Sequence, residues 1–538
     1  MSRRISRREF NRLAAATGAL AVIPFGGAGA QLRFINDPFQ LGVASGDPAA
    51  DGFVIWTRLA PEPFDTAHLG QVIYEVSWEV AEDASFSRLA RHGVAWARPH
   101  LAHSVHVVVH GLEPGREYFY RFRIGRYESA TGRALTCPAA GAAVDSLRFS
   151  FSSCAHYEQG FFSAYRWMAE DRPDLMLMLG DYIYEDAWGE RRVRQFNSLE
   201  AVTLQDYRHR YTQYRTDPDL QAAHAACPWL VTWDDHEVDN DYAALTSEHE
   251  LCGGAPVRES FPARRAAAYQ AWFEHMPVRP SRLRAEMGVQ IYGATDWGAL
   301  ARFYVLDTRQ YRSVQVCPNP PTVQRCDFER GGKILFGGAG GGTHVDPRDP
   351  VCRAALNDPA RTMLGAEQER WLDEALAGSR AAWNILAQNV MLMTVLEERN
   401  GTPSMFTDAW AGYPPARERL FAALAKHRTA NPVVLTGDIH SFWINELVNA
   451  AGRAMGVELA TTSIATTTYD KSDALPLNPG TRFHDGRHNG YVRCELNRER
   501  LRTDVVAIDE RTDPRSGRRV LASFDTRSGD PRVHRVGG

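Results

Sequence analysis

Four segments of the sequence place metal-binding types of side chain directly after a run of apolar residues. The four are Leu147–Phe151 before Ser152-Ser153-Cys154, Leu175–Leu179 before Gly180-Asp181-Tyr182-Ile183-Tyr184-Glu185, Trp229–Trp233 before Asp234-Asp235-His236-Glu237, and Val433–Gly437 before Asp438-Ile439-His440. Carboxylates and phenolates suit hard cations such as Fe³⁺, and imidazole and thiolate add ligands of borderline softness. The pattern therefore indicates a metal site that is assembled from distant parts of the chain.

The apolar runs have the length and composition of strands that are buried on both faces of a sheet. In α/β proteins the functional groups lie beyond the C-terminal ends of such strands, so we expect the four segments to meet. Stretches of helical character lie between the runs, among them 162–171, 204–214 and 364–377. This alternation predicts an α/β layer architecture for a catalytic domain that spans residues 145–510.

The segment after the second run also suggests how many cations are held. Asp181 and Tyr184 are three residues apart just past one strand, so both side chains can face one site. A carboxylate at a strand end is well placed to bridge two cations. Two cations about 3.5–4 Å apart activate water and stabilise in-line displacement at phosphorus. The residues themselves therefore point to hydrolysis of a phosphoric ester.

Residues 38–140 show short runs that are rich in β-branched and aromatic residues. These runs are Val54–Thr57, Tyr74–Trp78, Ser104–Val109 and Tyr118–Phe122. Turn signals such as Gly46-Asp47-Pro48 separate them, which predicts a small all-β domain of immunoglobulin or fibronectin type. No cluster of ionisable residues stands out in it, so we expect it to be structural or to shape the mouth of the site. Residues 511–538 are predicted to be a polar C-terminal tail.

The composition is that of an ordinary globular protein, with 44% hydrophobic and 23% charged residues in a chain of 538. The 61 Lys and Arg residues against 65 Asp and Glu residues give a formal net charge of −4. A nucleic-acid-binding protein needs a basic face. We therefore expect no sequence-specific binding of nucleic acid.

The first thirty residues have the organisation of a cleaved export signal. A twin arginine in Ser6-Arg7-Arg8-Glu9-Phe10-Asn11-Arg12 precedes the apolar stretch Leu13–Phe25 and the small residues Ala28-Gly29-Ala30. The apolar stretch is too short to be a stable transmembrane helix. The alternative to an export signal is a basic N-terminal arm. The segment resembles a twin-arginine (Tat) signal peptide. This resemblance implies passage through the Tat translocon and a periplasmic or secreted protein without a transmembrane segment.

Eight cysteines are present, and an oxidising compartment would allow some of them to form disulfides. Cys317, Cys326 and Cys352 lie in an insert rich in glycine and proline, where a bridge would fix a loop. The spacing does not give the connectivity. Cys154 differs from the others because it follows a strand among the candidate ligands, which favours a metal thiolate; a small buried core residue is the alternative.

The motifs quoted for the second, third and fourth segments resemble the metallophosphoesterase signature in the variant found in PhoD-like alkaline phosphatases. Four further segments of the sequence are similar to that family: Gly42–Pro48, Asp206-Tyr207-Arg208, Asn240-Asp241-Tyr242-Ala243 and Asp307–Arg312. The resemblance covers nearly the whole chain after the signal. It implies a metallophosphoesterase-type αββα sandwich that follows the small all-β domain.

The resemblance also implies a role for each candidate ligand. Asp181 would bridge two cations, and Cys154, Tyr184 and His440 would complete the site for Fe³⁺. Asp235 and Asp438 would bind a second cation, which is Ca²⁺ in this family. Asn240 is a candidate ligand for an additional Ca²⁺, and other divalent metals are possible.

His236 follows Asp235 directly, and the resemblance places it over the phosphoryl group and not on a metal. There it would stabilise the charged transition state or protonate the leaving group, with Glu237 or Asp234 orienting its other nitrogen. The catalytic set is thus His236, Asp181 and Asp235, with a metal-bound hydroxide as the nucleophile. Arg309 and Arg312 could bind phosphate oxygens or form structural ion pairs, and the role of His156 is open.

Three functions are compatible with these residues. The leading hypothesis is an exported phosphomonoesterase or phosphodiesterase of the alkaline phosphatase D type. The alternative within the same chemistry is a phospholipase D-type phosphodiesterase that acts on phospholipid or a teichoic-acid-like polymer. The third hypothesis is a metal-containing binding protein without catalytic activity, but this hypothesis gives His236 no function.

Overall fold

The computed structural model describes residues 22–23, 32–65, 68–189, 191–247, 260–284, 288–317, 344–399 and 401–537. The predicted export signal at residues 1–30 therefore lies outside the described residues, except for β1 (Val22–Ile23), which pairs in parallel with β4 (Ile73–Ala81). In these described ranges, no helix has both the length and the apolar character that crossing a membrane requires.

A ten-stranded sheet contains three of the four apolar runs as neighbouring parallel strands. They are β10 (Leu147–Ser152), β11 (Leu175–Leu179) and β12 (Pro228–Thr232). The order of the strands is β26-β25-β24-β23-β10-β11-β12-β2-β3-β6. Because β10, β11 and β12 are parallel and adjacent, the loops that follow them leave the sheet at the same edge.

The fourth run lies in a seven-stranded sheet as β19 (Pro432–Thr436). The order of that sheet is β13-β14-β16-β19-β21-β20-β22. Its other strands are β13 (Gly293–Trp297), β14 (Ala301–Val305), β16 (Trp383–Ala387), β20 (Phe442–Val448), β21 (Ala454–Ala460) and β22 (Thr481–Asp485).

Alternation along the strands explains why the two sheets pack face to face. Successive side chains of a strand point to opposite faces, and the leucines of β11 belong to a core shared by both sheets, whereas Met176 and Met178 belong to a core with helices. Each fully buried side chain of this kind contributes roughly 1.5–3 kcal/mol. The strands therefore read as uninterrupted apolar runs because both of their faces are covered.

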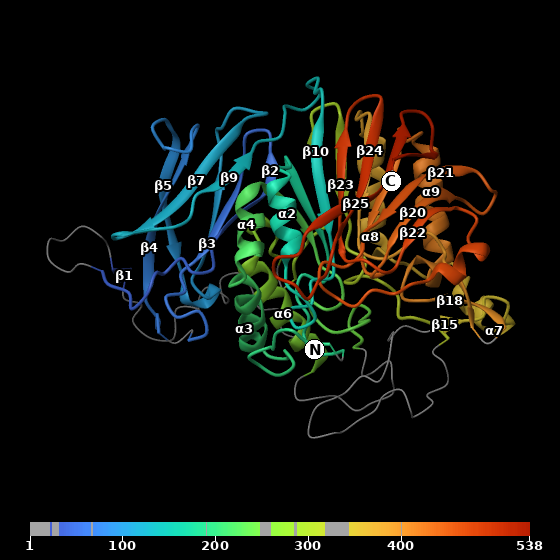
Figure 1. The fold of residues 1–538 in the computed structure, drawn as a ribbon, viewed down its shortest axis with the longest axis horizontal. Coiled ribbons are helices and arrows are strands. Elements are labelled where there is room, and N and C mark those ends of the chain that lie inside the picture. Colours follow the sequence, from blue (N-terminus) through green and yellow to red (C-terminus); the bar gives the residue numbers. More distant parts are fainter. Residues whose placement is uncertain are drawn as a thin grey trace, which may run out of the picture.

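Helices cover the outer face of each sheet (Figure 1). On the ten-stranded sheet they are α2 (Ser163–Glu170), α3 (Leu204–Arg215), α4 (Pro218–Ala226) and α6 (Phe261–His275), and on the seven-stranded sheet α8 (Gly365–Ala377) and α9 (Pro414–Lys426). Thr203 and Asp206 form a capping box that begins α3. The predicted αββα layers are confirmed.

The N-terminal all-β region is also confirmed, but one of its sheets is continuous with the catalytic sheet. Strands β2 (Val43–Ala49), β3 (Gly52–Arg58) and β6 (Ser104–Val109) extend the ten-stranded sheet because β2 pairs in parallel with β12. They share a core with the sheet of β4, β5 (Leu89–Ala97), β7 (Glu117–Ile124), β8 (Tyr127–Glu128) and β9 (Gly132–Leu135). The small sandwich thus lies at one end of the molecule (Figure 1).

The prediction of a polar tail at residues 511–538 is wrong. The chain there forms β25 (Arg518–Arg527) and β26 (Val533–Gly537), which extend the ten-stranded sheet beyond β23 (Gly490–Leu496) and β24 (Arg500–Ile508). Ala522, Phe524 and Val533 pack into the core between the two sheets. Charged residues at exposed positions of these two strands, such as Arg519, Arg527 and Arg535, gave the segment the composition of a polar tail.

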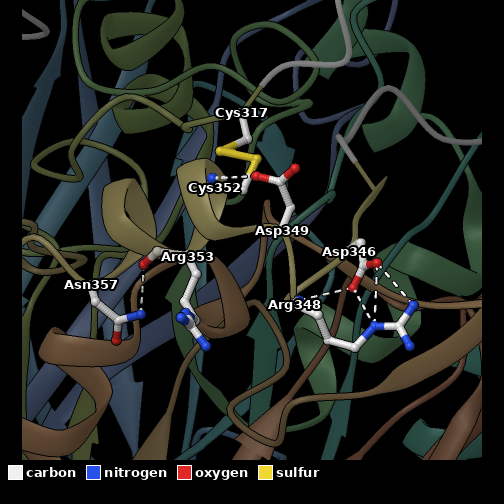
Figure 2. Close-up of a disulfide and its surroundings, with 7 residues drawn as sticks. All are labelled: Cys317, Asp346, Arg348, Asp349, Cys352, Arg353 and Asn357. Carbon is white, nitrogen blue, oxygen red and sulfur yellow. Dashed lines mark hydrogen bonds and ion pairs between the residues drawn. A yellow bond between two sulfur atoms is a disulfide. The ribbon is translucent and has the colours of Figure 1, made fainter.

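A disulfide joins Cys317 to Cys352 in the first turn of α7 (Pro350–Leu356), with Cα atoms 5.5 Å apart (Figure 2). Asp349 caps this helix by accepting a hydrogen bond of 2.8 Å from the Cys352 backbone N–H. The bridge spans 35 residues, so it closes the Gly- and Pro-rich insert as expected. Cys326 lies outside the described residues. A small sheet of β15 (His344–Val345), β17 (Leu396–Arg399) and β18 (Thr402–Phe406) lies nearby.

Candidate metal centre

The segments after β10, β11, β12 and β19 converge. Cys154 Sγ, a carboxylate oxygen of Asp181 and a ring nitrogen of His440 lie within 4.8 Å of one another, and all three residues are buried. The residues come from loops of both central sheets. The structure therefore brings together three of the predicted ligands, although 286 positions separate Cys154 from His440 in the sequence.

The backbone of this site is held in an unusual conformation. Cys154, Asp181, Asp438 and His440 have φ angles of 59°, 55°, 61° and 52°. Residues other than glycine rarely adopt the left-handed region, which costs of order 1–3 kcal/mol each and is concentrated at functional sites. Gly180 has a φ of 98°, and a Cβ there would lie 2.4 Å from Asp234 Cβ, so only glycine fits. Packing of the loops keeps the ligand-bearing turns in place.

Tyr184 completes this group. Its hydroxyl donates to Asp181 Oδ2 at 3.0 Å and lies 3.2 Å from His440 Nε2. His440 Nδ1–H donates to the Thr467 carbonyl at 3.0 Å, which leaves the Nε2 lone pair facing the cluster, as metal-ligating histidines are usually arranged. Burial lowers the pKa of His440 to about 3, so its imidazole is neutral and able to coordinate.

A second cluster shares Asp181 with the first. Ligand atoms of Asp181, Asp235 and His236 also lie within 4.8 Å of one another. Asp235 accepts backbone hydrogen bonds from His236 at 3.0 Å and Asp241 at 2.8 Å, which fix its carboxylate. Asp181 therefore stands where a bridging carboxylate of a two-cation site would stand.

His236 is oriented by Glu185, and the prediction that Glu237 or Asp234 does so is wrong. His236 Nδ1–H donates to Glu185 Oε2 at 2.7 Å, with side chains that are 12% and 6% exposed. Burial alone would lower the pKa of His236 because it disfavours the charged ring. The negative charges of Glu185, Asp235 and Asp181 together have a larger effect and hold this pKa well above its usual value. The ring is therefore held as a cation that can donate from Nε2.

Glu237 instead ties two of the loops together. Its carboxylate accepts backbone hydrogen bonds from Asp181 at 3.1 Å, Tyr182 at 2.6 Å and Asp234 at 2.7 Å. Burial raises the pKa of Glu237 to about 7, and these hydrogen bonds act in the opposite direction. The residue thus joins the turn after β11 to the turn after β12.

Arg309 and Arg312 are structural cations beneath the site. Their side chains are 0% exposed, and both pair with Asp408, at 2.6 Å each. Arg309 also pairs with Asp234 through Nε and lies 3.5 Å from Asp235 Oδ2 through Nη2. Guanidinium groups that are so fully enclosed favour structural ion pairs over binding of phosphate oxygens.

Asp438 and Asn240 lie at the margin of these clusters. Asp438 Oδ1 is 4.0 Å from Arg309 Nη2, and its side chain is 18% exposed. Burial raises the pKa of Asp438 to about 7, against the lowering effect of Arg309. The backbone N–H of Asn240 donates to Glu185 Oε1 at 3.0 Å. Coordination by either side chain stays a prediction.

Sequence reasoning missed several residues that shape the site. Asp408 and Asp241 form a third buried group with Asp235, and Glu185 holds His236. Trp188 and Tyr469 stack on the His440 ring, with ring centroids 6.2 and 5.4 Å away. Glu185 belongs to the motif that follows the second apolar run, but the sequence does not show that Glu185 and not Glu237 contacts His236. Trp188 and Tyr469 follow no sequence spacing that would have predicted their contact with His440.

The residues present fit a bound cation. Asp181 Oδ1 is buried and has no hydrogen-bond partner among the described residues. Burial keeps the pKa of Asp181 well above its usual value in the metal-free protein, against the lowering effect of His236, and repulsion from Asp235 and the other carboxylates adds to the rise. Buried charges need compensation, and Arg309 already serves Asp234 and Asp408. Cations with oxygen, nitrogen and sulfur ligands would supply the missing positive charge.

Comparison with known proteins defines the class. Residues 149–505 match the family described as "PhoD-like phosphatase", and residues 26–138 match "PhoD-like phosphatase, N-terminal domain". The chain belongs to the PhoD-like phosphatase family, and it is a phosphatase.

Two known proteins show how close the relationship is. Alkaline phosphatase D of Bacillus subtilis (strain 168) is 41% identical over 507 residues, which cover 91% of this chain and 81% of that protein. A solved structure titled "Structure of PhoD" has a TM-score of 0.84 and 39% identity and covers 94% of both chains. The predicted resemblance to PhoD-like alkaline phosphatases is confirmed.

Proposed function

We propose that this phosphatase is a metal-dependent hydrolase of phosphomonoesters or phosphodiesters, and that its active site is the candidate metal centre. One observation carries the proposal: the Asp181 carboxylate lies within 4.8 Å both of the ligand atoms of Cys154 and His440 and of the Asp235 carboxylate, beside which His236 lies as a proton donor and not as a ligand. A carboxylate that is shared between two ligand groups is what a two-cation hydrolytic site requires.

Two different cations are proposed for the two halves. Cys154, Tyr184 and His440 offer sulfur, phenol and imidazole ligands, which suit Fe³⁺. Asp235 and Asp438, with Asn240, offer oxygen ligands, which suit one or two Ca²⁺. When bound, the cations would withdraw charge from the phosphoryl oxygens and lower the pKa of a water molecule that attacks phosphorus.

The residues of the chain supply the remaining steps. Asp181 holds both halves of the site together, and Asp235 is kept in one orientation by its two backbone hydrogen bonds. His236 is held by Glu185 with its Nε2–H directed away from that carboxylate, so it can stabilise the charged phosphoryl group or give the leaving oxygen its proton. Trp188 and Tyr469 limit the access of water to His440.

Substrate preference is tested by comparing p-nitrophenyl phosphate, bis-p-nitrophenyl phosphate and phosphatidylcholine. Hydrolysis of either nitrophenyl ester supports the proposal, and cleavage of phosphatidylcholine alone would favour the phospholipase D-type alternative. His236→Ala should abolish turnover while metal content is retained. Turnover that is unchanged in this variant would refute the role of His236.

Export is the other part of the proposal. The twin arginine of Arg7 and Arg8, the apolar stretch and the small residues at 28–30 support passage through the Tat translocon to the periplasm or the medium. Replacement of both arginines by lysine should retain the protein in the cytoplasm. Export that continues in this variant would contradict the Tat assignment.

A further inference from the structure

A cavity of ≈ 230 Å³ lies at the junction of the N-terminal sandwich with α3. Arg58 at the end of β3, His103 before β6 and Arg208 of α3 line it, together with Leu59, Leu69 and Ala102. None of these residues belongs to the candidate metal centre. The expectation that the N-terminal region carries no ionisable cluster is wrong, because Glu62, Asp65 and His68 lie within 4.8 Å of one another and Arg208 of α3 joins Arg58 and His103 in lining the cavity.

Arg58 is a buried cation that lacks a carboxylate of its own. The residue is 2% exposed, and no described carboxylate lies within 4.0 Å of its guanidinium. Its Nε–H donates to the Ala102 carbonyl at 2.7 Å, and its Nη1 contacts Thr212 Oγ1 at 2.6 Å and His275 Nε2 at 2.9 Å. These partners are neutral. Among the described residues the Nη2 group of Arg58 has no hydrogen-bond partner.

Glu274, the carboxylate whose charge acts on Arg58, is already engaged by another arginine. Arg208 contacts Glu274 through both Nε and Nη2, at 2.7 and 2.6 Å, which is the bidentate geometry that arginine and carboxylate prefer. Two guanidinium groups thus share one carboxylate beside the cavity. Burial of a charge without a partner of opposite charge costs free energy. Burial is also the main reason why the pKa of Arg58 is lowered to about 10.

The walls and the opening define what could enter. Leu59, Leu69 and three prolines give the cavity an apolar side, and polar and charged groups line the rest, a combination that small-molecule sites use to hold and orient a ligand. Ala102 and His103 are consecutive residues with φ angles of 51° and 58°, a strained conformation that is typical of ligand-binding segments. Glu62 is half-buried and Asp65 is exposed, so negative charge gathers at the opening.

We propose that this cavity, the Arg58 pocket, binds a small organic molecule that carries a carboxylate at one end and an ammonium group at the other. The carboxylate accepts hydrogen bonds from Arg58 Nη2, the carbon chain lies along the apolar wall, and the ammonium group lies near Glu62 and Asp65. The site is separate from the metal centre and does not depend on the proposed function.

Calorimetric titration of the metal-loaded, full-length protein with 4-aminobutanoate and 6-aminohexanoate tests the proposal. At least one of them should bind with one-to-one stoichiometry. Hexanoate should bind about two- to fivefold more weakly, because ion pairs at an exposed opening contribute little, and hexylammonium should not bind. Absence of saturable binding by both amino acids, or equal binding of hexylammonium, would overturn the proposal.

Two substitutions with opposite expected signs separate binding from misfolding. Arg58→Gln should weaken binding of the amino acid at least tenfold. Glu274→Gln keeps the shape of the side chain but removes the competing carboxylate, so affinity should rise severalfold. Arg91→Gln is the control, because the exposed Arg91 also donates to backbone carbonyls but lies outside the pocket. Weakening in both Arg58→Gln and Glu274→Gln would contradict the assignment.

Discussion

Neutralising Glu185 should change the pH dependence of catalysis without removing the metal. In Glu185→Gln the side chain keeps its size and an acceptor oxygen, but the charge 2.7 Å from His236 Nδ1 is lost. A hydrogen bond to a charged partner is worth about 1.5–3 kcal/mol, and about 1.4 kcal/mol corresponds to one pKa unit. The pKa of His236 should therefore fall by about one to two units.

The sign of the effect follows from the form of His236 that acts. The imidazolium is present below its pKa, so a lower pKa removes the proton donor at lower pH. The alkaline limb of the profile of kcat against pH, measured with p-nitrophenyl phosphate, should move down by about one to two pH units. Asp186→Asn neutralises the next carboxylate in the chain and is the matched control. An unmoved alkaline limb at constant metal content would show that the Glu185 charge does not set the pKa of His236.

Three further changes probe the ion pairs, the metal ligands and the buried histidines. Arg309→Met should destabilise the metal-free protein by about 3–5 kcal/mol, since it leaves buried carboxylates unpaired, whereas Arg302→Met at a partly exposed pair should change the denaturation midpoint little. Cys154→Ser should lower bound iron in elemental analysis and remove any visible charge-transfer band, and Cys227→Ser, at a buried thiol that belongs to none of the ligand groups, should retain both. Burial, then Arg58, keeps the pKa of His275 well below its unfolded value, so stability should fall by about 1.4 kcal/mol per pH unit below about pH 6.5. In denaturant titrations His275→Gln should flatten that decline, and an unchanged slope would exclude His275 as its source.

The sequence predicted the strands of the catalytic domain well, because their composition reflects their surroundings. Leu175–Leu179 is apolar at every position since one face meets the second sheet and the other meets helices. The residues after these strands were found for the same reason, because parallel strands deliver their loops to one edge. The charged outer face of β25 hid a strand whose Ala522 and Phe524 are core residues.

Contacts between distant loops could not be predicted in the same way. Glu185 and Glu237 are both carboxylates in quoted motifs, and only the packed loops show that Glu185 reaches His236 while Glu237 accepts backbone hydrogen bonds. The environment of Arg309 likewise depends on Asp408, 99 residues away. Arg58 gains its role in a cavity only when α3 is in place. Such roles depend on tertiary geometry, which has no local signature in the sequence.

The most direct test of the central claim is anomalous diffraction at the iron absorption edge from crystals of the protein as purified. We predict a peak bounded by Cys154 Sγ, the Asp181 carboxylate, the Tyr184 hydroxyl and His440 Nε2, with a second cation sharing Asp181. Absence of a cation between these side chains, or a cation held elsewhere in the active protein, would contradict the account.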